Sequence, residues 1–199
     1  GERAFCTGLD LKVALPALNE GDALGYDDPA KRPFQNNFKP IITAVNGVCV
    51  AGGLEFMLGT DIRIAAEHAS FGITEAKVGR GMPWAAPLVH MLPQRIVMEV
   101  LLTAQPLSAQ RLHALGYVNN VVPQAQLIDR ALQMARTIAA HAPLTVRAAR
   151  ELVYLSTEMG RSAGLRAAQH LFEPVYLSDD AQEGPRAFTE KRPPRWSGR

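Results

Sequence analysis

The chain is poor in several features that mark specialised protein classes. Only two of its 199 residues are cysteines, which is too few for a disulfide framework. Cys6 and Cys49 lie in apolar segments beside glycine turns, so we predict small core residues in a reducing, cytoplasmic compartment. No apolar run reaches the roughly 18 residues that a membrane helix needs, so we expect no membrane partner.

The chain also lacks an excess of charge and the spacing of common catalytic motifs. Its net charge is +2 and its basic residues are scattered, which excludes the basic stripe typical of nucleic-acid-binding proteins. The exception is the closing KRPPRWSGR, residues 191–199, which we interpret as a solvated end. The five histidines show no H-x-x-H spacing, so we predict no metal site. The absence of G-x-S-x-G excludes the nucleophile elbow of serine hydrolases.

Two glutamates stand beside glycine-bearing turns. Glu55 lies in VNGVCVAGGLEFMLGTD and Glu75 in HASFGITEAKVGRG. The apolar, β-branched residues 41–50 predict a buried strand, and the glycines after Ala51 let the backbone turn into a helix over about 53–60. Free N–H groups at such a turn suit negative charge. Glu55 therefore either does proton chemistry beside an anion hole or only complements the helix dipole.

A second glycine turn near the start of the chain favours the chemical alternative. In GERAFCTGLDLK the apolar step ends at Thr7-Gly8. Leu9 then carries an N–H group just past the glycine, and Asp10 can cap the segment after it. Two glycine-turn N–H donors and two carboxylates suit acyl chemistry through an enolate-like oxyanion, in which the donors hold the oxygen and the carboxylates move protons.

Four segments of the chain resemble the enoyl-CoA hydratase/isomerase (crotonase) family. They are FCTGLDLK, residues 39–79, LTAQPLSAQRLHALGYVNNVVP and EGPRAFTEKRPP, which leave only about residues 13–37 outside the likeness. The resemblance implies an α/β fold with a crotonase-like spiral core of ββα units and mixed sheets, followed by a helical C-terminal region. It also implies about 60 residues ahead of Gly1, so we expect the first strands of the fold to be absent from this chain.

The same resemblance implies roles for individual residues. The backbone N–H groups of Leu9 and Gly52 would form the oxyanion hole, and Glu55 and Glu75 would be the catalytic pair of a hydratase. The implied contacts to the substrate and its CoA part come from five consecutive or near-consecutive residues, Thr7, Leu9, Asp10, Leu11 and Lys12. The implied reaction is the reversible syn addition of water to a 2-enoyl-CoA thioester, a lyase activity of fatty acid metabolism. It needs no cofactor, because coenzyme A is part of the substrate.

One segment departs from the family pattern. Hydratases usually carry a glycine-rich stretch after the second glutamate, where this chain has PWAAPLVHML, residues 83–92. Trp84, Ala85 and Ala86 replace small flexible residues and Pro87 stiffens the segment, which is expected to line the acyl end of the pocket. Three alternatives therefore stay open: a double-bond isomerase, a carnitinyl-CoA-type dehydratase, and a non-catalytic acyl-CoA-binding homologue.

The remaining pattern divides the chain into two regions. Residues 1–123 are expected to form the catalytic core, with strands at 61–67, 69–73 and 117–123, a capped helix at 107–116, and helical signals over 84–103 that Pro87 and Pro93 interrupt. Residues 13–38 are expected to be a loop with one short helix. Residues 124–199 are expected to form a helical region, with helices at 124–141, 143–159 and 162–177. Their apolar faces predict a homotrimer or a dimer of trimers.

Overall fold

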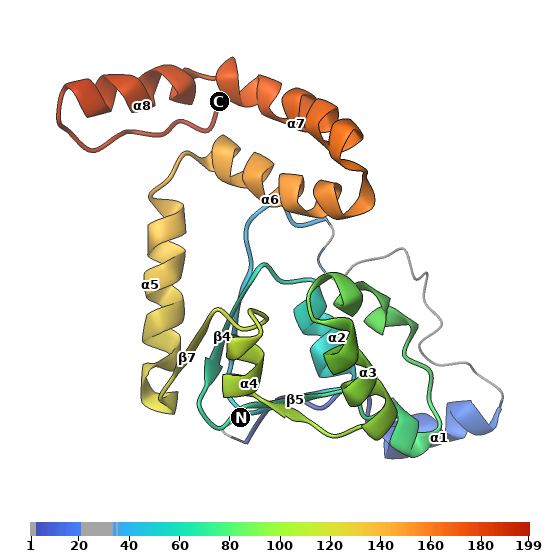
Figure 1. The fold of residues 1–199 in the computed structure, drawn as a ribbon. Coiled ribbons are helices and arrows are strands. Elements are labelled where there is room, and N and C mark those ends of the chain that lie inside the picture. The colour runs from blue at the N-terminus through green and yellow to red at the C-terminus, as the bar shows by residue number, and fades with distance from the viewer. Residues whose placement is uncertain (1–2, 21–33, 35) are drawn as a thin grey trace. The chain divides into compact units, whose positions relative to one another are not determined.

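A computed structural model describes residues 3–20, 34 and 36–199, and Figure 1 follows them along the chain. The chain divides into two compact units. The first contains Gly1–Asn37 and Ile41–Ala131, and the second contains Phe38–Pro40 and Leu132–Arg199. The sequence pattern set the boundary between residues 123 and 124, and the trimerisation role expected of residues 124–199 stays a prediction.

The first unit is built around two small sheets. One has the strand order β1 (Ala4–Cys6), β3 (Val48–Val50), β5 (Ser70–Gly72) and β6 (Leu107–Ser108). In it β1, β3 and β5 run parallel, whereas β6 runs antiparallel to β5. The other sheet has the order β2 (Ile42–Val45), β4 (Ile62–Ala66) and β7 (Asn120–Val122), all parallel. Both the parallel strands and the mixed sheet match the expected α/β class.

The prediction of one continuous strand over residues 41–50 is wrong. The segment forms two strands that belong to different sheets, β2 and β3, with Asn46 and Gly47 between them. A Cβ atom on Gly47 would lie 2.5 Å from the backbone oxygen of Arg3, so only glycine allows the chain to pass β1 this closely. Because both strands are apolar and β-branched, their composition carries no sign of the change of sheet.

The helices of the first unit fall close to the expected positions. They are α1 (Leu11–Asn19), α2 (Gly52–Leu58), the 3₁₀ segments η1 (Glu75–Val78) and η2 (Pro83–His90), α3 (Gln94–Thr103), α4 (Ala109–Ala114), η3 (Gln124–Gln126) and α5 (Leu127–Ala139), the last of which continues into the second unit. The side chain of Ser108 accepts a hydrogen bond from Arg111 N at 3.2 Å, which confirms the N-cap expected there. The short helix expected within residues 13–38 corresponds to α1, and residues 21–33 and 35 lie outside the described residues.

The second unit contains α6 (Pro143–Glu158), α7 (Arg161–Tyr176) and α8 (Asp179–Thr189). Helices α6 and α7 pack against each other, as Figure 1 shows, and α7 also contacts α8. Helix α8 was not expected from the sequence, although its start carries a clear signal. Ser178 accepts a hydrogen bond from Ala181 N at 3.2 Å, and Asp179 and Asp180 occupy the first turn, where acidic side chains complement the helix dipole. Among the described residues, no helix is long and apolar enough to cross a membrane.

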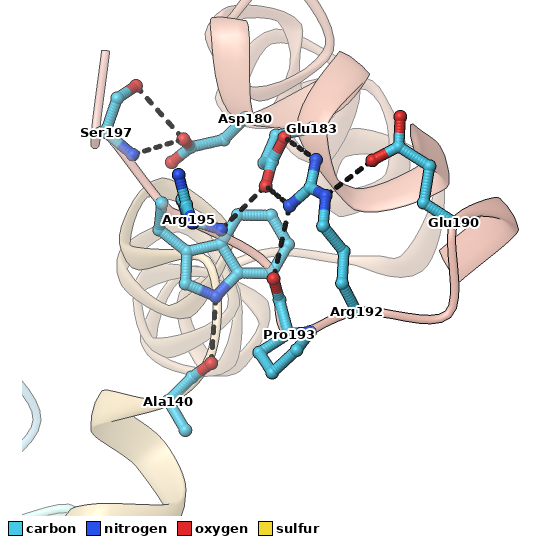
Figure 2. Close-up of polar contacts among 9 residues, drawn as sticks. Ala140, Asp180, Glu183, Glu190, Arg192, Pro193, Arg195 and Ser197 are labelled. Atoms are coloured by element: carbon cyan, nitrogen blue, oxygen red, sulfur yellow. Dashed lines mark hydrogen bonds and ion pairs between the residues drawn. The ribbon is translucent and has the colours of Figure 1, made fainter. Parts of the chain in front are cut away.

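Most of residues 191–199 are exposed, as expected of a solvated end, but this tail also folds back onto its own unit (Figure 2). Arg192 forms an ion pair with Glu183 at 2.6 Å, which lowers the pKa of Glu183 to about 2. The indole N–H of Trp196 donates to Ala140 O at 2.8 Å. Ser197 N donates to Asp180 Oδ1 at 2.6 Å. The tail therefore has acidic partners on α8, which the sequence pattern did not indicate.

Candidate active site

The segments expected to form the site all follow the carboxyl ends of three neighbouring parallel strands. Cys6 at the end of β1 pairs with Cys49 of β3, and Val50 at the end of β3 pairs with Gly72 at the end of β5. Ala51 N donates to Gly72 O at 3.1 Å, so β3 and β5 stay joined up to the point where β3 ends. Loops at the carboxyl edge of parallel strands are the usual place for a ligand site in α/β proteins.

The two glycine turns are in direct contact. A Cβ atom on Gly8 would lie 2.8 Å from Gly52 N, and one on Gly52 would lie 3.2 Å from Gly8 Cα. A Cβ atom on Gly53 would lie 2.2 Å from Cys6 O. Gly8 also has a φ of +82°, in the left-handed region that favours glycine. The structure therefore brings together the two turns that were singled out from the sequence, through a contact that side chains would prevent.

Ala51 carries the strain of the second turn. Its φ is 52° and its ψ is −128°, a combination that is essentially confined to glycine. Residues in such regions cost on the order of 1–3 kcal/mol and concentrate at functional sites. This conformation turns the chain sharply between the last residue of β3 and the first residue of α2. The strain was not predictable from the residue type, because alanine there reads as an ordinary small residue.

The two backbone N–H groups expected to form the oxyanion hole are available as donors. Gly52 is the first residue of α2 and precedes the first intrahelical bonds, in which Leu54 N and Glu55 N donate to Ala51 O at 2.8 and 3.1 Å. Within the described part of the chain, neither Leu9 N nor Gly52 N has a hydrogen-bond partner. Such free donors can hold an oxyanion. Their role as an oxyanion hole stays a prediction.

Glu55 is half-buried in the first turn of α2. The other end of this helix is held by Arg63, a buried residue of β4 whose guanidinium donates to Met57 O at 3.3 Å and to Thr60 O at 3.4 Å. The same guanidinium lies 4.3 Å from the centre of the Tyr117 ring. A cation at the carboxyl end of a helix stabilises it. Arg63 therefore helps to fix the helix that carries both Gly52 and Glu55, a contribution that the sequence did not indicate.

Glu75 is buried, with 8% of its surface exposed, at the start of η1 and just past β5. Burial raises the pKa of its carboxyl group, and hydrogen bonds from the backbone N–H groups of Glu75 and Thr74 and from the Trp84 side chain lower it in part. The net direction is upward. Its Oε2 atom is buried and has no hydrogen-bond partner among the described residues. A buried carboxyl oxygen without a partner is costly in a purely structural role and is common where a carboxyl group exchanges protons.

The residues expected to contact CoA form an exposed stretch after β1. Thr7, Leu9, Leu11 and Lys12 are all exposed. The Asp10 side chain accepts a hydrogen bond from Lys12 N at 3.0 Å, and Asp10 O accepts one from Ala14 N at 3.0 Å. Asp10 therefore caps α1, as its place before the helix predicted. The contacts of this stretch with CoA stay predictions.

The whole chain matches one known protein family. Residues 1–199, the whole chain, match the model of a family described as enoyl-CoA hydratase/isomerase. The chain belongs to this family. Its α/β core and helical C-terminal region are accordingly those of the crotonase fold, as the structural neighbours also show.

The relatives of this family member include several named hydratases and dehydratases. The chain is 38% identical over 202 residues to (E)-benzylidenesuccinyl-CoA hydratase of Thauera aromatica, covering 100% of this chain and 78% of the relative. It is 38% identical over 212 residues to carnitinyl-CoA dehydratase of Proteus mirabilis, covering 100% and 79%. The crystal structure of an enoyl-CoA hydratase from Bacillus anthracis aligns with a TM-score of 0.89 at 32% identity, covering 100% of this chain and 79% of that one.

Two further features of this crotonase-family chain concern metal ligands and the surroundings of Glu75. Among the described residues, no group of three or more His, Cys, Asp and Glu side chains is placed to hold a metal ion. The segment that departs from the family pattern was expected to line the acyl end of the pocket, and its Trp84 side chain also lowers the pKa of Glu75 in part. The position of Trp84 among apolar residues after Pro83 suggests packing and gives no sign of an effect on Glu75.

Proposed function

We propose that this chain catalyses the reversible syn addition of water to a 2-enoyl-CoA thioester. The observation that carries the proposal is the meeting of four elements at one sheet edge. Two glycine turns with free N–H groups touch each other there, and two glutamates follow the ends of adjacent parallel strands. The names of the hydratase and dehydratase relatives support the same reaction class.

In this mechanism the backbone polarises the substrate. The N–H groups of Leu9 and Gly52 donate to the thioester oxygen, where negative charge develops as water attacks. A donor of this kind contributes about 10²–10³ to turnover. The exposed stretch from Thr7 to Lys12 would lie along the CoA part, with the Lys12 ammonium available to a phosphate group. The substrate enters with its acyl end toward the glutamates.

The two carboxyl groups divide the proton transfers. Glu55 accepts a proton from the attacking water, whose oxygen forms the new bond to C3, while the double bond shifts its electrons toward the thioester oxygen. Glu75 then gives a proton to C2 as the enolate collapses. Burial raises the pKa of Glu75 and so favours its protonated form, which suits a proton donor. In the reverse direction each group takes the opposite role.

A substrate panel tests the proposal. The panel contains straight-chain 2-enoyl-CoA and 3-enoyl-CoA thioesters, and also benzylidenesuccinyl-CoA and carnitinyl-CoA because relatives are named for acting on them. We expect 2-enoyl-CoA to lose the absorbance of its conjugated double bond and to gain the mass of one water. Conversion of 3-enoyl-CoA to 2-enoyl-CoA without a mass change would instead identify an isomerase. Saturable binding of every thioester with no turnover would identify a binding homologue.

We further propose that the protein assembles as a homotrimer or a dimer of trimers. Its second unit exposes large apolar side chains, including Leu165 at 60% and Leu177 at 81%. Faces of this kind are typical of association surfaces. Light scattering at micromolar concentration tests this assembly, and a clean monomer at that concentration contradicts it.

A further inference from the structure

The two cysteines of the chain lie opposite each other in neighbouring strands. Cys6 ends β1 and Cys49 lies in the middle of β3, and the two are Cα partners in this parallel pair. Neighbouring strands are about 4.8 Å apart, and a disulfide needs a separation of about 4.4–6.8 Å between its two Cα atoms. Both thiols are free. One bond between their sulfur atoms would therefore join β1 to β3.

The two thiols differ in their surroundings. Cys6 is half-buried, whereas Cys49 has no exposed surface. Burial and, to a smaller extent, the neighbouring Cys6 raise the pKa of the Cys49 thiol to about 12, and Arg63 lowers it in part. Cys49 therefore stays a protonated, unreactive thiol. A small oxidant that enters from solvent meets Cys6 first.

Each cysteine leads into one of the two glycine turns of the candidate site. Leu9 follows Cys6 by three residues, and Gly52 follows Cys49 by three residues. Helix α2 also packs tightly on the first cysteine, because a Cβ atom on Gly53 would lie 2.9 Å from Cys6 Cβ. A shift of Cys6 is therefore passed on to both turns, which carry the two free N–H groups.

We propose that Cys6 and Cys49 form a disulfide when a peroxide oxidises the protein, and that this bond switches off the site that the two glycine turns form. The effect on turnover rests on the proposed function, whereas the bond itself does not. Among the described strands, β1 lies at the edge of its sheet and β3 is held between β1 and β5. The register of β1 already shifts between Ala4 and Cys6. The new bond therefore moves the end of β1, and with it the Leu9 N–H group.

The oxidation proceeds in two balanced steps. The Cys6 sulfur attacks one peroxide oxygen, the O–O bond breaks, and Cys6 becomes a sulfenic acid as one water leaves. The Cys49 sulfur then attacks the Cys6 sulfur, the S–O bond breaks, and a second water leaves with the Cys49 proton. The two thiols lose two electrons and two hydrogen atoms in total, and the peroxide takes them up. A thiol reductant reverses the bond.

The bond can be tested without substrate, because a chain with two cysteines can form only one internal disulfide. The full chain is treated with hydrogen peroxide, unfolded, alkylated and weighed. We expect the loss of both thiols together and a linked Cys6–Cys49 peptide in a non-reducing digest, and dithiothreitol should restore both thiols. Two outcomes overturn the proposal. One is Cys6 carrying two or three oxygen atoms while Cys49 still reacts with the alkylating reagent, and the other is a dimer linked through Cys6.

The switch is tested by turnover of a 2-enoyl-CoA substrate before and after the same treatment. We expect kcat to fall about 10²-fold, since displacement of a catalytic group by about 1 Å has an effect of this size, and to recover on reduction. Cys6→Ser is the matched control and should show no loss on oxidation relative to its own untreated protein. If this variant does not fold, the recovery of wild type on reduction makes the same comparison. Full turnover in the disulfide-linked protein, or a loss that reduction does not reverse, overturns the switch. A disulfide that forms in a protein that hydrates nothing keeps the bond and rejects the proposed function instead.

Discussion

Replacing Gly8 with alanine tests the contact between the two glycine turns. The new Cβ atom would lie 2.8 Å from Gly52 N, 3.1 Å from Ala51 Cβ and 3.4 Å from Gly52 Cα. The first of these distances is far inside van der Waals contact, and the atom that it meets is backbone. The second turn must therefore move away from the first, and it carries Gly52 N–H with it.

The expected loss of stability has two parts. An alanine at a φ of +82° is in the left-handed region, which costs about 1–2 kcal/mol. Overpacking against the second turn adds about 1–3 kcal/mol. The free energy of unfolding should therefore fall by about 2–5 kcal/mol. If the Gly52 N–H is an oxyanion donor, its displacement should also lower kcat about 10²–10³-fold.

Gly116→Ala is the matched control for the backbone part. Gly116 has a φ of +80°, and a Cβ atom there would meet nothing within 4 Å. This variant should lose only about 1–2 kcal/mol and keep its turnover. Urea unfolding gives both free energies, and the absorbance of a 2-enoyl-CoA substrate gives both values of kcat. Equal losses of stability in the two variants, together with wild-type turnover in Gly8→Ala, would refute the reasoning that the two turns form one site.

Three other variants address the glutamates and the strained turn. Glu55→Gln and Glu75→Gln should each lower turnover on the order of 10²–10⁴-fold. The loss in the double variant should be smaller than the product of the two single losses, since groups that act as a unit are non-additive. If the substrate panel shows a loss in only one of the two single variants, the result indicates an isomerase. Because the folded-state pKa of Glu75 is raised, wild type should lose stability relative to Glu75→Gln as the pH rises from the unfolded-state pKa through the folded-state pKa. Urea unfolding from acid to alkaline pH measures this difference in the free energy of unfolding. A difference that does not change with pH contradicts the raised pKa of the Glu75 carboxyl. Ala51→Gly should raise the free energy of unfolding by up to about 2 kcal/mol because it relieves the strained φ, and a loss of stability in the same assay speaks against strain.

Much of the candidate site could be predicted because it depends on short, local signals. Glycines after an apolar strand mark a turn whatever surrounds them, and a carboxylate one turn into the following helix can be named from spacing alone. Asp10 and Ser108 were identified as caps in this way, and both accept the expected hydrogen bond. The proline positions likewise separated η2 from α3. Each of these features depends only on residues a few positions away in the sequence, so it can be predicted from the sequence alone.

Other features were missed because they join residues far apart in the chain. The tail after Lys191 reads as polar and basic, yet Arg192, Trp196 and Ser197 have partners on α8 and at Ala140. Each partner is an ordinary surface residue type, and nothing in its own surroundings shows that the tail returns to it. The change of sheet at Gly47 is similar, since the reason for it is the Arg3 backbone.

The sequence by itself determined the family, the two glycine turns and the identity of the two glutamates, because residue type and spacing are enough to recognise them. Only the tertiary structure decided that Gly8 touches Gly52 and that the Glu75 carboxyl is buried. The physical reason is that a carboxyl group's protonation depends on what surrounds it in three dimensions. Burial removes water from Glu75 and raises its pKa, and the Trp84 side chain, which lowers that pKa in part, belongs to a different segment. Neither effect is written in the residues next to Glu75.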